Sequence, residues 1–524
     1  MKGLLLIGAL VPHFLWAQVQ SSFLQDPPIP GNEPSIAVHP QDPSDVWVAF
    51  NNNHVYHTLN AGKQWLKIDV NPDQGFYGDP VVKVSPKGTV YLAHLAKNIR
   101  ENKKHPEWFD CIVFERSTNG VEFHATCIGK NGKMQDKPAI NFDQQPKSKY
   151  NGNVYAAWTE FDKYNSSNSS DSSRIRFSFS EDDGVSFSPP ITVSDKSGNA
   201  TDDDGTAEGT SMWIGKQGEV FLVWSKMDTL WMDVSKDGGR SWGKDQFLAT
   251  MPGGWDVKGI KGLVRCNVMP MISGDKKGGI YVVYGAQEWT NGPQSLYYVY
   301  SADGGKQFSH PLKINDEKPE ISDASYAQAV FPYIDLDENW GYPRVIWYDF
   351  RGSLTGRFVM VYTSVLKKRK PLPNTCLSNQ PIVLHSKNIF YGDYIGFDSW
   401  KGGGRAAVTT FHEELQKPVV EILEWKGKKA QMNNTAPTLI LNHNGDGDSL
   451  IFCTNMPGET SYTFEIRNGR SIVAQKVTES IRHSEFSLLD FEEFHLSRKA
   501  LSPGLYTIVV KRKTKAIKKN IWID

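Results

Sequence analysis

The sequence predicts an all-β protein built from repeated four-stranded units, and three observations lead to this fold class. The frame Ser-x-Asp-x-Gly-x-x-aromatic occurs in full three times, starting at Ser180, Ser235 and Ser301. Seven pairs of short apolar strands recur over the first 435 residues. The chain is also rich in Gly, Trp and Tyr and has few apolar stripes at helical spacing. These features favour a β-propeller of four-stranded antiparallel blades, with seven blades favoured and six possible.

The N-terminal segment 1–17 has the composition of a secretory signal peptide. It reads MKGLLLIGALVPHFLWA, with one lysine, a short apolar run and a small residue before Gln18. Leu15 departs from the small-x-small rule, which leaves the exact cleavage site open. No later segment is apolar enough to span a bilayer. We therefore expect a mature chain that is secreted or attached to the cell surface.

Each predicted blade begins with an apolar strand that follows a proline or a small residue. The first three such strands lie at 33–40, 78–86 and 136–143, and each is followed by a more aromatic second strand. A third strand, a turn and a fourth strand complete most units of the propeller, which we place at 18–435. The seventh unit has only about three clear strands, so we expect the segment SSFLQ at 21–25 to supply its outer strand and close the ring.

The repeated frame lies where each predicted blade turns between its third and fourth strands. Glycine supplies a positive φ at no steric cost, and the short Ser and Asp side chains bond backbone N–H groups that a tight turn leaves unpaired. A weaker copy runs from Thr58 to Trp65, and another lies near Gly120 and Phe123, where we interpret the Ser and Asp positions as lost. Turn chemistry accounts for every specified residue, so the frame is interpreted as architecture.

With these boxes the chain resembles the Asp-box, or BNR-repeat, proteins of the sialidase superfamily. In that superfamily the boxes are structural turns on propeller blades. The resemblance implies a sialidase-like propeller over 18–435. Known sialidases of the superfamily have six blades, so the seven strand pairs indicate a divergent relative.

The repeat pattern of the sequence ends at about residue 436, where the boxes stop and another β-rich segment begins. Over 436–524 we expect a small β-sandwich. The residues Leu501, Gly504 and Tyr506 follow the frame Leu-x-x-Gly-x-Tyr, and Val509 comes after them before a basic tail. This end resembles the C-terminal sorting domain of Bacteroidetes type IX secretion substrates, which implies the secretion machinery as a partner. The alternative is an ordinary immunoglobulin-like appendage, whose lysine-rich strand discourages edge pairing.

Charge and cysteine content restrict the possible partners and the compartment. Lys plus Arg and Asp plus Glu both number 58, so no net charge draws the chain to nucleic acid or to anionic membranes. Five cysteines in a secreted chain leave at least one unpaired. Cys111 and Cys127 lie symmetrically about the turn near Asn119, which places them opposite each other in one hairpin, either as a disulfide or as structural thiols. No cysteine has the spacing of a zinc site.

Strand order places the candidate functional residues on one face of the propeller. Inner strands start, and second strands end, on an upper face, whereas the boxes lie on the lower face. Carboxyl groups are frequent at these upper positions, and crowding at a propeller axis raises a carboxyl pKa and makes a general acid. The candidates that strand order selects are Asp79, Asp136, Glu208, Arg265, Arg351 and Tyr394.

The resemblance to retaining sialidases implies specific roles for these residues. Such enzymes use three arginines to hold the substrate carboxylate, a Tyr with a Glu as the nucleophile pair, and an Asp as acid/base. Matched to this chain, Tyr394 and Glu208 form the pair, Asp79 or Asp136 is the acid/base, and Arg265, Arg351 and Arg405 hold the substrate. The Arg-Ile-Pro motif of the first blade is absent, however, and Glu33-Pro34 occupies its place. We therefore expect a neutral or uronic sugar rather than a sialoside.

Structural roles compete with each of these assignments. An Asp before Pro can fix an inter-blade turn, Arg265 and Arg351 can neutralise neighbouring carboxylates, and Tyr394 can serve packing alone. The TDDDG run at 201–205 is a solvated loop or a structural Ca²⁺ site, and we expect no other metal and no cofactor.

Two functions from different classes remain. The first is a secreted glycoside hydrolase that acts on extracellular glycans or glycoproteins. The second is a non-catalytic propeller that binds glycans or proteins at the cell surface. Three arginines that converge on the axis would favour the hydrolase, and a neutral, aromatic-lined axis would favour the binding protein.

Overall fold

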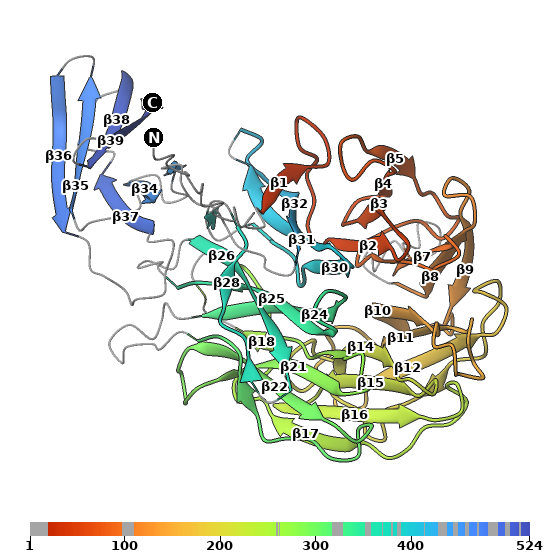
Figure 1. Ribbon diagram of the computed structural model, residues 1–524. Helices are drawn as coiled ribbons and strands as arrows, with labels where there is room; N and C mark the ends of the chain where they lie inside the picture. The colour runs from red at the N-terminus through yellow and green to blue at the C-terminus, as the bar shows by residue number, and fades with distance from the viewer. Residues whose placement is uncertain are drawn as a thin grey trace, which may run out of the picture.

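The computed structural model describes residues 19–96, 109–257, 263–316, 328–351, 358–368, 370–378, 381–384, 389–412 and 414–427, together with Ile260 and the strands between Thr438 and Ile523. Over the part of the chain up to residue 427, seven antiparallel sheets form a ring (Figure 1). The inner strands of successive sheets contact one another, and the first contacts the last. The protein is therefore an all-β, seven-bladed propeller, and the six-bladed alternative is wrong.

The first four blades each contain four strands, in order from the inner to the outer strand. Blade 1 is β2 (Ser35–His39), β3 (Asp42–Ala49), β4 (His54–Thr58) and β5 (Leu66–Asp69). Blade 2 is β6 (Val81–Val84), β7 (Val90–Leu95), β8 (Ile112–Ser117) and β9 (His124–Ile128). Blade 3 is β10 (Met134–Phe142), β11 (Val154–Phe161), β12 (Ser173–Ser180) and β13 (Ile191–Thr192). Blade 4 is β14 (Glu208–Ile214), β15 (Val220–Ser225), β16 (Thr229–Ser235) and β17 (Gln246–Thr250).

The last three blades vary more at their outer edges. Blade 5 is β20 (Met271–Gly274), β21 (Ile280–Gln287), β22 (Gln294–Ser301) and β23 (Leu312–Lys313). Blade 6 is β24 (Ala329–Asp337), β25 (Tyr342–Asp349) and β26 (Phe358–Lys367), and β26 pairs with three short strands, β27 (Lys370–Pro371), β28 (Thr375–Cys376) and β29 (Ile382–Val383). Blade 7 is β30 (Gly396–Trp400), β31 (Gly403–His412) and β32 (Lys417–Lys426). A separate pair, β18 (Asp256–Val257) and β19 (Cys266–Asn267), lies between blades 4 and 5 in sequence.

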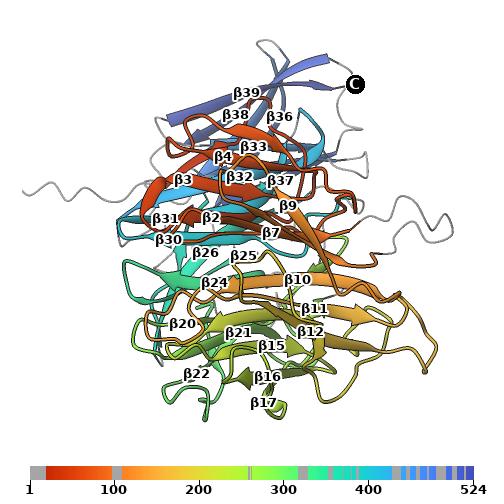
Figure 2. The same cartoon turned by 90° about the vertical axis from the view of Figure 1, so that its right-hand side faces the viewer.

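The N-terminal strand β1 (Gln20–Phe23) closes the ring as the outer strand of blade 7. It pairs antiparallel with β32, with Gln20 opposite Glu424 and Phe23 opposite Glu421. Figure 1 shows β1, in red, beside the cyan β32, and Figure 2 shows β2 next to β30 and β31. The predicted closure by the segment at 21–25 is thereby confirmed, within a residue or two.

The core lies between the blades. Every residue of β11, β7 and β15 is buried, because neighbouring blades cover both faces of each second strand. These strands are accordingly continuous apolar runs with few polar interruptions. Large aromatic side chains such as Trp158, Trp224 and Trp347 fill the wedge-shaped space between sheets.

The three full boxes form the predicted turns. In the box of blade 4, the Ser235 hydroxyl donates to Asp237 Oδ1 (2.8 Å) and accepts from the Gly239 N–H (2.8 Å). Asp237 Oδ1 also accepts from the Ser241 N–H (2.8 Å). Gly239 has φ +88°, which only glycine adopts without strain. The boxes that start at Ser180 and Ser301 repeat this pattern.

The weak copy in blade 2 corrects the sequence interpretation. Its Ser and Asp positions are not lost, because Ser117 Oγ donates to Asn119 Oδ1 (3.1 Å) and accepts from the Gly120 N–H (2.9 Å). The turn is one residue shorter between the serine and the glycine than the other boxes. A search at fixed spacing misses this turn for that reason. In addition, Asn119 takes the place of the Asp.

The aromatic residue of the box packs on the preceding blade. The Trp242 ring meets Phe177 of blade 3 edge to face, with centroids 4.9 Å apart, and Phe187 meets Phe114 of blade 2 in the same way at 4.7 Å. The sequence predicts only a role within the turn for the residues of the box. The structure shows that the aromatic ring also joins neighbouring blades.

A disulfide joins Cys111 to Cys127 across β8 and β9, with their Cα atoms 5.7 Å apart, which confirms the facing pair predicted from the turn. This bond is consistent with an extracellular location. Among the residues that the structure describes, no helix is long and apolar enough to cross a membrane. The predicted signal peptide at 1–17 lies outside the described residues.

Beyond the propeller, seven strands fall into two antiparallel sheets. One contains β33 (Thr438–His443), β34 (Ser449–Asn455) and β37 (Phe491–Ser497). The other contains β36 (Ser471–Glu479), β35 (Ser461–Asn468), β38 (Gly504–Arg512) and β39 (Lys515–Ile523). Tyr506 of the sorting-domain frame and the Val509 that follows it are buried in β38, whereas Leu501 lies outside the described residues. The assignment of 436–524 to a sorting-type sandwich stays a prediction.

Candidate functional site

The candidate site is built on the residues that lead into the inner strands. Glu33, Asp79, Lys137 and Phe331 each precede a proline at the start of an inner strand. All four have positive φ, at 55°, 54°, 46° and 52°. This region of backbone space is uncommon for residues other than glycine, and such values concentrate at functional sites. In blade 3 the left-handed Lys137 falls within a register shift of the β10–β11 pair, between Asp136 and Ala139.

A buried ion cluster centres on Asp393 of blade 7. Its carboxylate lies 2.5 Å from the ammonium of Lys137 and 3.1 Å from the guanidinium of Arg265. Burial would raise the pKa of Asp393, but Lys137 and Arg265 outweigh burial and hold this pKa below its ordinary value. The Asp393 N–H also donates to Glu33 Oε1 (2.9 Å), which joins blade 7 to blade 1.

Further carboxyl groups surround this cluster and interact with one another. Burial and the carboxyls of Asp79 and Asp393 raise the pKa of Glu33 well above its ordinary value. Burial, reinforced by Asp79 and Asp202 and opposed by Lys137, raises the pKa of Asp136 to about 7. Because like charges cannot all be ionised at close range, these carboxyls hold protons near neutral pH.

Glu208 is the most deeply enclosed of these acids. Its side chain is fully buried, and neither carboxyl oxygen has a hydrogen-bond partner among the described residues. Burial and the Asp202 carboxylate raise the pKa of Glu208 well above its ordinary value. A buried polar group without a partner is costly, so Glu208 indicates a site that something else completes.

Two tyrosines adjoin the carboxyl groups. Tyr394 donates from its hydroxyl to the Pro80 carbonyl (3.2 Å), and burial together with Glu33 and Asp79 raises its pKa well above its ordinary value. Tyr164 donates to Asp202 Oδ2 (2.5 Å), and burial together with Asp136 and Asp202 raises its pKa. The electrostatic neighbours of Glu208 therefore include Tyr164, whereas those of Tyr394 include Glu33, Asp79, Asp393 and Tyr333. Among the described contacts, none joins Tyr394 to Glu208.

Of the three predicted arginines, only Arg265 belongs to the cluster. It lies just before β19, 3.6 Å from Asp202 Oδ2, and its guanidinium packs over the Trp255 ring at 5.6 Å. Arg351 binds Asp349 (2.8 Å) and Asp316 (2.7 Å) and stacks over Tyr362 at 4.2 Å.

Arg405 is placed at the other end of its blade. It is buried at the start of the second strand of blade 7, opposite Asp398 in the register. Its guanidinium binds Glu424 (2.8 Å) and the Pro43 carbonyl (2.8 Å). The partners given above for Arg405 and Arg351 lie outside the cluster around Asp393, so the described contacts do not bring the three predicted arginines together.

Sequence reasoning missed Lys137 and Tyr164. Lys137 is adjacent to Asp136, and regular strand alternation would send the two side chains to opposite faces. The register shift and the positive φ of Lys137 bring both into the same cluster. The dipeptide Lys137-Pro138, which matches Glu33-Pro34 and Asp79-Pro80, was the available signal. Tyr164 comes from the loop after β11 and carries no comparable signal.

The axis continues below this cluster as a second group of buried charges. Lys83 of β6 lies 3.8 Å from Asp335 of β24. Burial and Asp335 raise the pKa of Asp398 of β30 to about 7, and Lys83 opposes that shift. Ionisable side chains thus follow the inner strands beyond their starts.

The carboxylates of the TDDDG loop at 201–205 all accept hydrogen bonds from the chain. Asp202 accepts from Tyr164, Asp203 Oδ1 accepts from the Gly205 N–H (2.8 Å), and Asp204 Oδ1 accepts from the Asp256 N–H (3.0 Å). In the described ranges, no group of three or more His, Cys, Asp or Glu side chains is arranged to hold a metal ion. Each of the three carboxylates thus already accepts a hydrogen bond from another residue of the chain.

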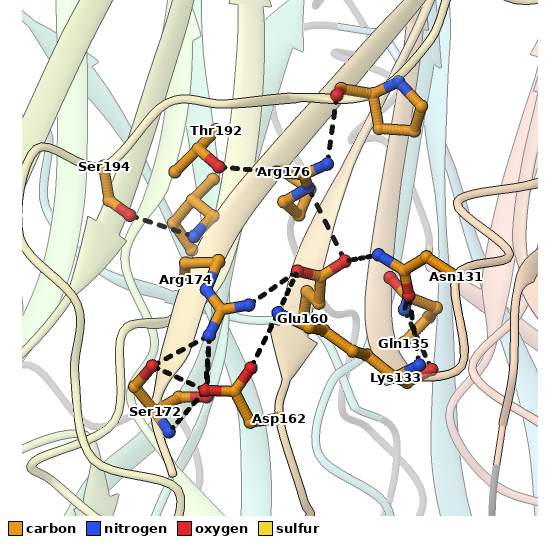
Figure 3. Close-up of polar contacts among 12 residues, drawn as sticks. Asn131, Lys133, Gln135, Glu160, Asp162, Ser172, Arg174, Arg176, Thr192 and Ser194 are labelled. Carbon is orange, nitrogen blue, oxygen red and sulfur yellow. Dashed lines mark hydrogen bonds and ion pairs between the residues drawn. The ribbon is translucent and has the colours of Figure 1, made fainter. Parts of the chain in front are cut away.

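A polar network supports the strand that carries Asp136 (Figure 3). Glu160, opposite Gln135 in the β10–β11 register, is buried and accepts from Arg174 (2.8 Å) and from Asn131 (2.6 Å). Gln135 donates in turn to Asn131 Oδ1 (3.2 Å) and accepts from the indole of Trp158 (2.5 Å). These bonds tie three strands of blade 3 together at Gln135, the residue before Asp136 in β10.

Comparison with known proteins identifies no family. No protein-family model and no curated protein match the chain. Solved structures do match. The α-L-arabinanase of Penicillium chrysogenum, complexed with arabinobiose, is 16% identical with a TM-score of 0.42 over 66% of this chain and 92% of that chain. YCF48 from Cyanidioschyzon merolae is 11% identical with a TM-score of 0.41 over 78% and 98%, and the NanB sialidase of Streptococcus pneumoniae is 10% identical with a TM-score of 0.37 over 77% and 69%. At these identities the likeness concerns the fold alone.

Proposed function

We propose that the chain is a secreted glycoside hydrolase that acts on extracellular glycans through the carboxyl cluster at the starts of its inner strands. The observation that carries this proposal is Asp136, a buried carboxyl group with a pKa of about 7. A group with such a pKa can donate a proton and take it back near neutral pH, as general acid/base catalysis requires. Asp79, which raises the pKa of Asp136, supplies the second carboxyl of a glycosidase pair.

The surrounding residues support these roles. Lys137 and Arg265 keep Asp393 ionised, and repulsion between the carboxyls of Glu208 and Asp136 favours a proton on at least one of them. A tyrosine nucleophile receives no support, because burial and nearby carboxyls raise the pKa of both Tyr394 and Tyr164. We therefore assign Tyr394 to substrate contact and the chemistry to carboxyl groups. Arg351 and Arg405 are left with structural ion pairs.

The test is turnover by the purified propeller on a panel of fluorogenic neutral, amino, uronic and sialic glycosides. For a cleaved substrate, Asp136→Asn should lower kcat by about 100-fold or more, because the amide cannot donate the catalytic proton. Glu338→Gln is the matched control, since Glu338 lies in the turn between β24 and β25, keeps 39% of its side chain exposed and pairs with Lys276. Equal turnover by Asp136→Asn and the wild type would remove Asp136 from the acid/base role.

A second candidate is a non-catalytic propeller that binds glycans or proteins at the cell surface. The observation that favours it is that Arg265, the one arginine that the described residues bring to the cluster, already pairs with Asp393 and Asp202. Binding of a glycan with no turnover on any member of the panel would select this candidate.

For the C-terminal segment, we propose a role in export or surface attachment. Its support is the loss of the repeat at about residue 436 and the Gly504 and Tyr506 positions of the sorting-domain frame, followed by Val509. The secretion machinery would be its partner.

A further inference from the structure

The axial cluster contains more acids than cations. Its carboxyl groups are those of Glu33, Asp79, Asp136, Asp202, Glu208 and Asp393, and its cations are Lys137 and Arg265. Asp393 engages both cations, and Asp202 shares Arg265. Glu33, Asp79, Asp136 and Glu208 form no ion pair within the described residues.

An independent observation shows that some of these carboxyl groups lack hydrogen-bond donors in the described structure. Glu208 is fully buried, and both of its oxygens lack a hydrogen-bond donor in the described structure. Asp202 Oδ1 is another buried oxygen without a donor. Buried carboxyl oxygens are nearly always satisfied in folded proteins, so donors from outside the chain are expected to complete them. Four acids without a cation, together with these unsatisfied oxygens, call for a donor that is itself positively charged.

We propose that the axial site takes a glycan whose sugars carry protonated amino groups. This inference rests on the proposed function only in taking a sugar as the ligand. An ammonium group supplies N–H donors and positive charge together. In the described structure, Glu208 and Asp202 Oδ1 lack donors, and Asp79, Asp136 and Glu208 lack a paired cation. A uronic or sialic acid would instead place a carboxylate beside uncompensated carboxyls, and both described cations of the cluster already pair with Asp393. The expectation of a uronic substrate is therefore replaced.

Part of the cluster is in contact with solvent. Asp202 and Arg265 keep 14% and 28% of their side chains exposed, and Asp79 is half-buried. The charged and titratable groups that act on Asp136 and Glu208 are Lys137 of β10, Asp79 before β6, Asp202 and Arg265 of the loops on either side of blade 4, and Tyr164 after β11. Because acids in this group hold protons in the free protein, binding of an ammonium group should release protons.

The experiment is isothermal titration calorimetry of the full chain at about pH 6, below the usual pKa of an amino group. The ligands are a β-1,4-linked glucosamine hexasaccharide and its fully N-acetylated counterpart, which has the same chain and linkage without the charge. The amine form should bind at least about tenfold more tightly, and its preference should weaken as salt is added. In buffers of different ionisation enthalpy, its binding alone should release protons. In Asp136→Asn the preference and the proton release should both decrease, and in Glu338→Gln both should persist.

Several outcomes would overturn the inference. The first is that the amine form binds no more tightly than the N-acetylated form, or does not bind. The second is tighter binding of a galacturonate hexasaccharide. The third is proton release by Ca²⁺ alone without a preference for the amine form. The proposal that the chain is a hydrolase can fail independently of this inference. Amine-selective binding without turnover of any glycan would reject catalysis and keep this inference, whereas turnover of a neutral glycan without an amine preference would do the reverse.

Discussion

The four left-handed residues at the starts of inner strands hold the axial side chains at a cost to stability. Glu33, Asp79, Lys137 and Phe331 all precede a proline, which further restricts the backbone of the residue before it. Each such conformation costs on the order of 1–3 kcal/mol. Buried, mutually repelling carboxyls add to that cost. The cluster is therefore a place where the chain gives up stability, as functional sites commonly do.

Titration of Asp136 should make that cost depend on pH. Its pKa of about 7 lies above the value of about 3.9 expected in the unfolded chain, so its protonated form stabilises the fold fully below about pH 4, and this contribution is lost as the pH rises through about 7. Glu33 and Glu208 act in the same direction. We expect the melting temperature of the wild type to fall between about pH 5 and pH 8, and that of Asp136→Asn to fall less. Thermal unfolding across this pH range checks the prediction, and identical slopes would contradict it.

At the scale of elements, the box turns explain how much of the structure could be predicted from the sequence. A fixed frame locates the turns that start at Thr58, Ser180, Ser235 and Ser301, because hydrogen bonding and positive φ demand specific residues at specific positions. The turn at Ser117 departs by one residue and escapes the frame, although its hydrogen bonds are equivalent. Closure of blade 7 by β1 could be predicted because an incomplete blade needs an outer strand.

Site residues could be predicted from the sequence only where strand order alone determines which end of the blade they occupy. Strand order brought Asp79, Asp136, Glu208, Arg265 and Tyr394 to one end of the axis. It failed for Arg351, whose side chain turns to Asp316 and Tyr362, since strand order fixes an end of the blade but not a side-chain direction. It failed for Lys137 because a register shift breaks strand alternation. Ion pairing across blades, which selects among such arrangements, has no signature in a single sequence.

Paired glycines in the box of blade 5 offer a test of the contact between blades. Gly304 and Gly305 both have positive φ, at 75° and 84°. A Cβ at Gly304 would meet nothing within 4 Å, whereas one at Gly305 would lie 2.9 Å from the Phe221 ring of blade 4. Gly304→Ala should cost about 1–2 kcal/mol from backbone strain alone, and Gly305→Ala should cost more, because the ring must also move. Urea unfolding measures both free energies of unfolding, and equal losses would show that the box does not fix blade packing.

At the scale of the whole molecule, the ring and the C-terminal sheets are built differently. The ring is closed by the pairing of its first and last strands, and inter-blade contacts, a disulfide and five hydrogen-bonded turns support it. The strands from β33 onward pair only with one another. A propeller that is complete without these strands should fold without them.

Removal of residues 438–524 tests this division and the proposed export role together. The truncated propeller should melt within a few degrees of the corresponding transition of the full chain, since no strand of the ring is lost. Expressed in the native host, it should remain in the periplasm, because the segment that resembles a sorting domain is gone. A deletion of β1, residues 19–25, is the contrasting variant, since it removes the outer strand of blade 7 and should lower the melting temperature of the ring while leaving export intact. Normal secretion of the chain that lacks 438–524 would reject the sorting role, and a large loss of its melting temperature would show instead that the C-terminal sheets stabilise the propeller.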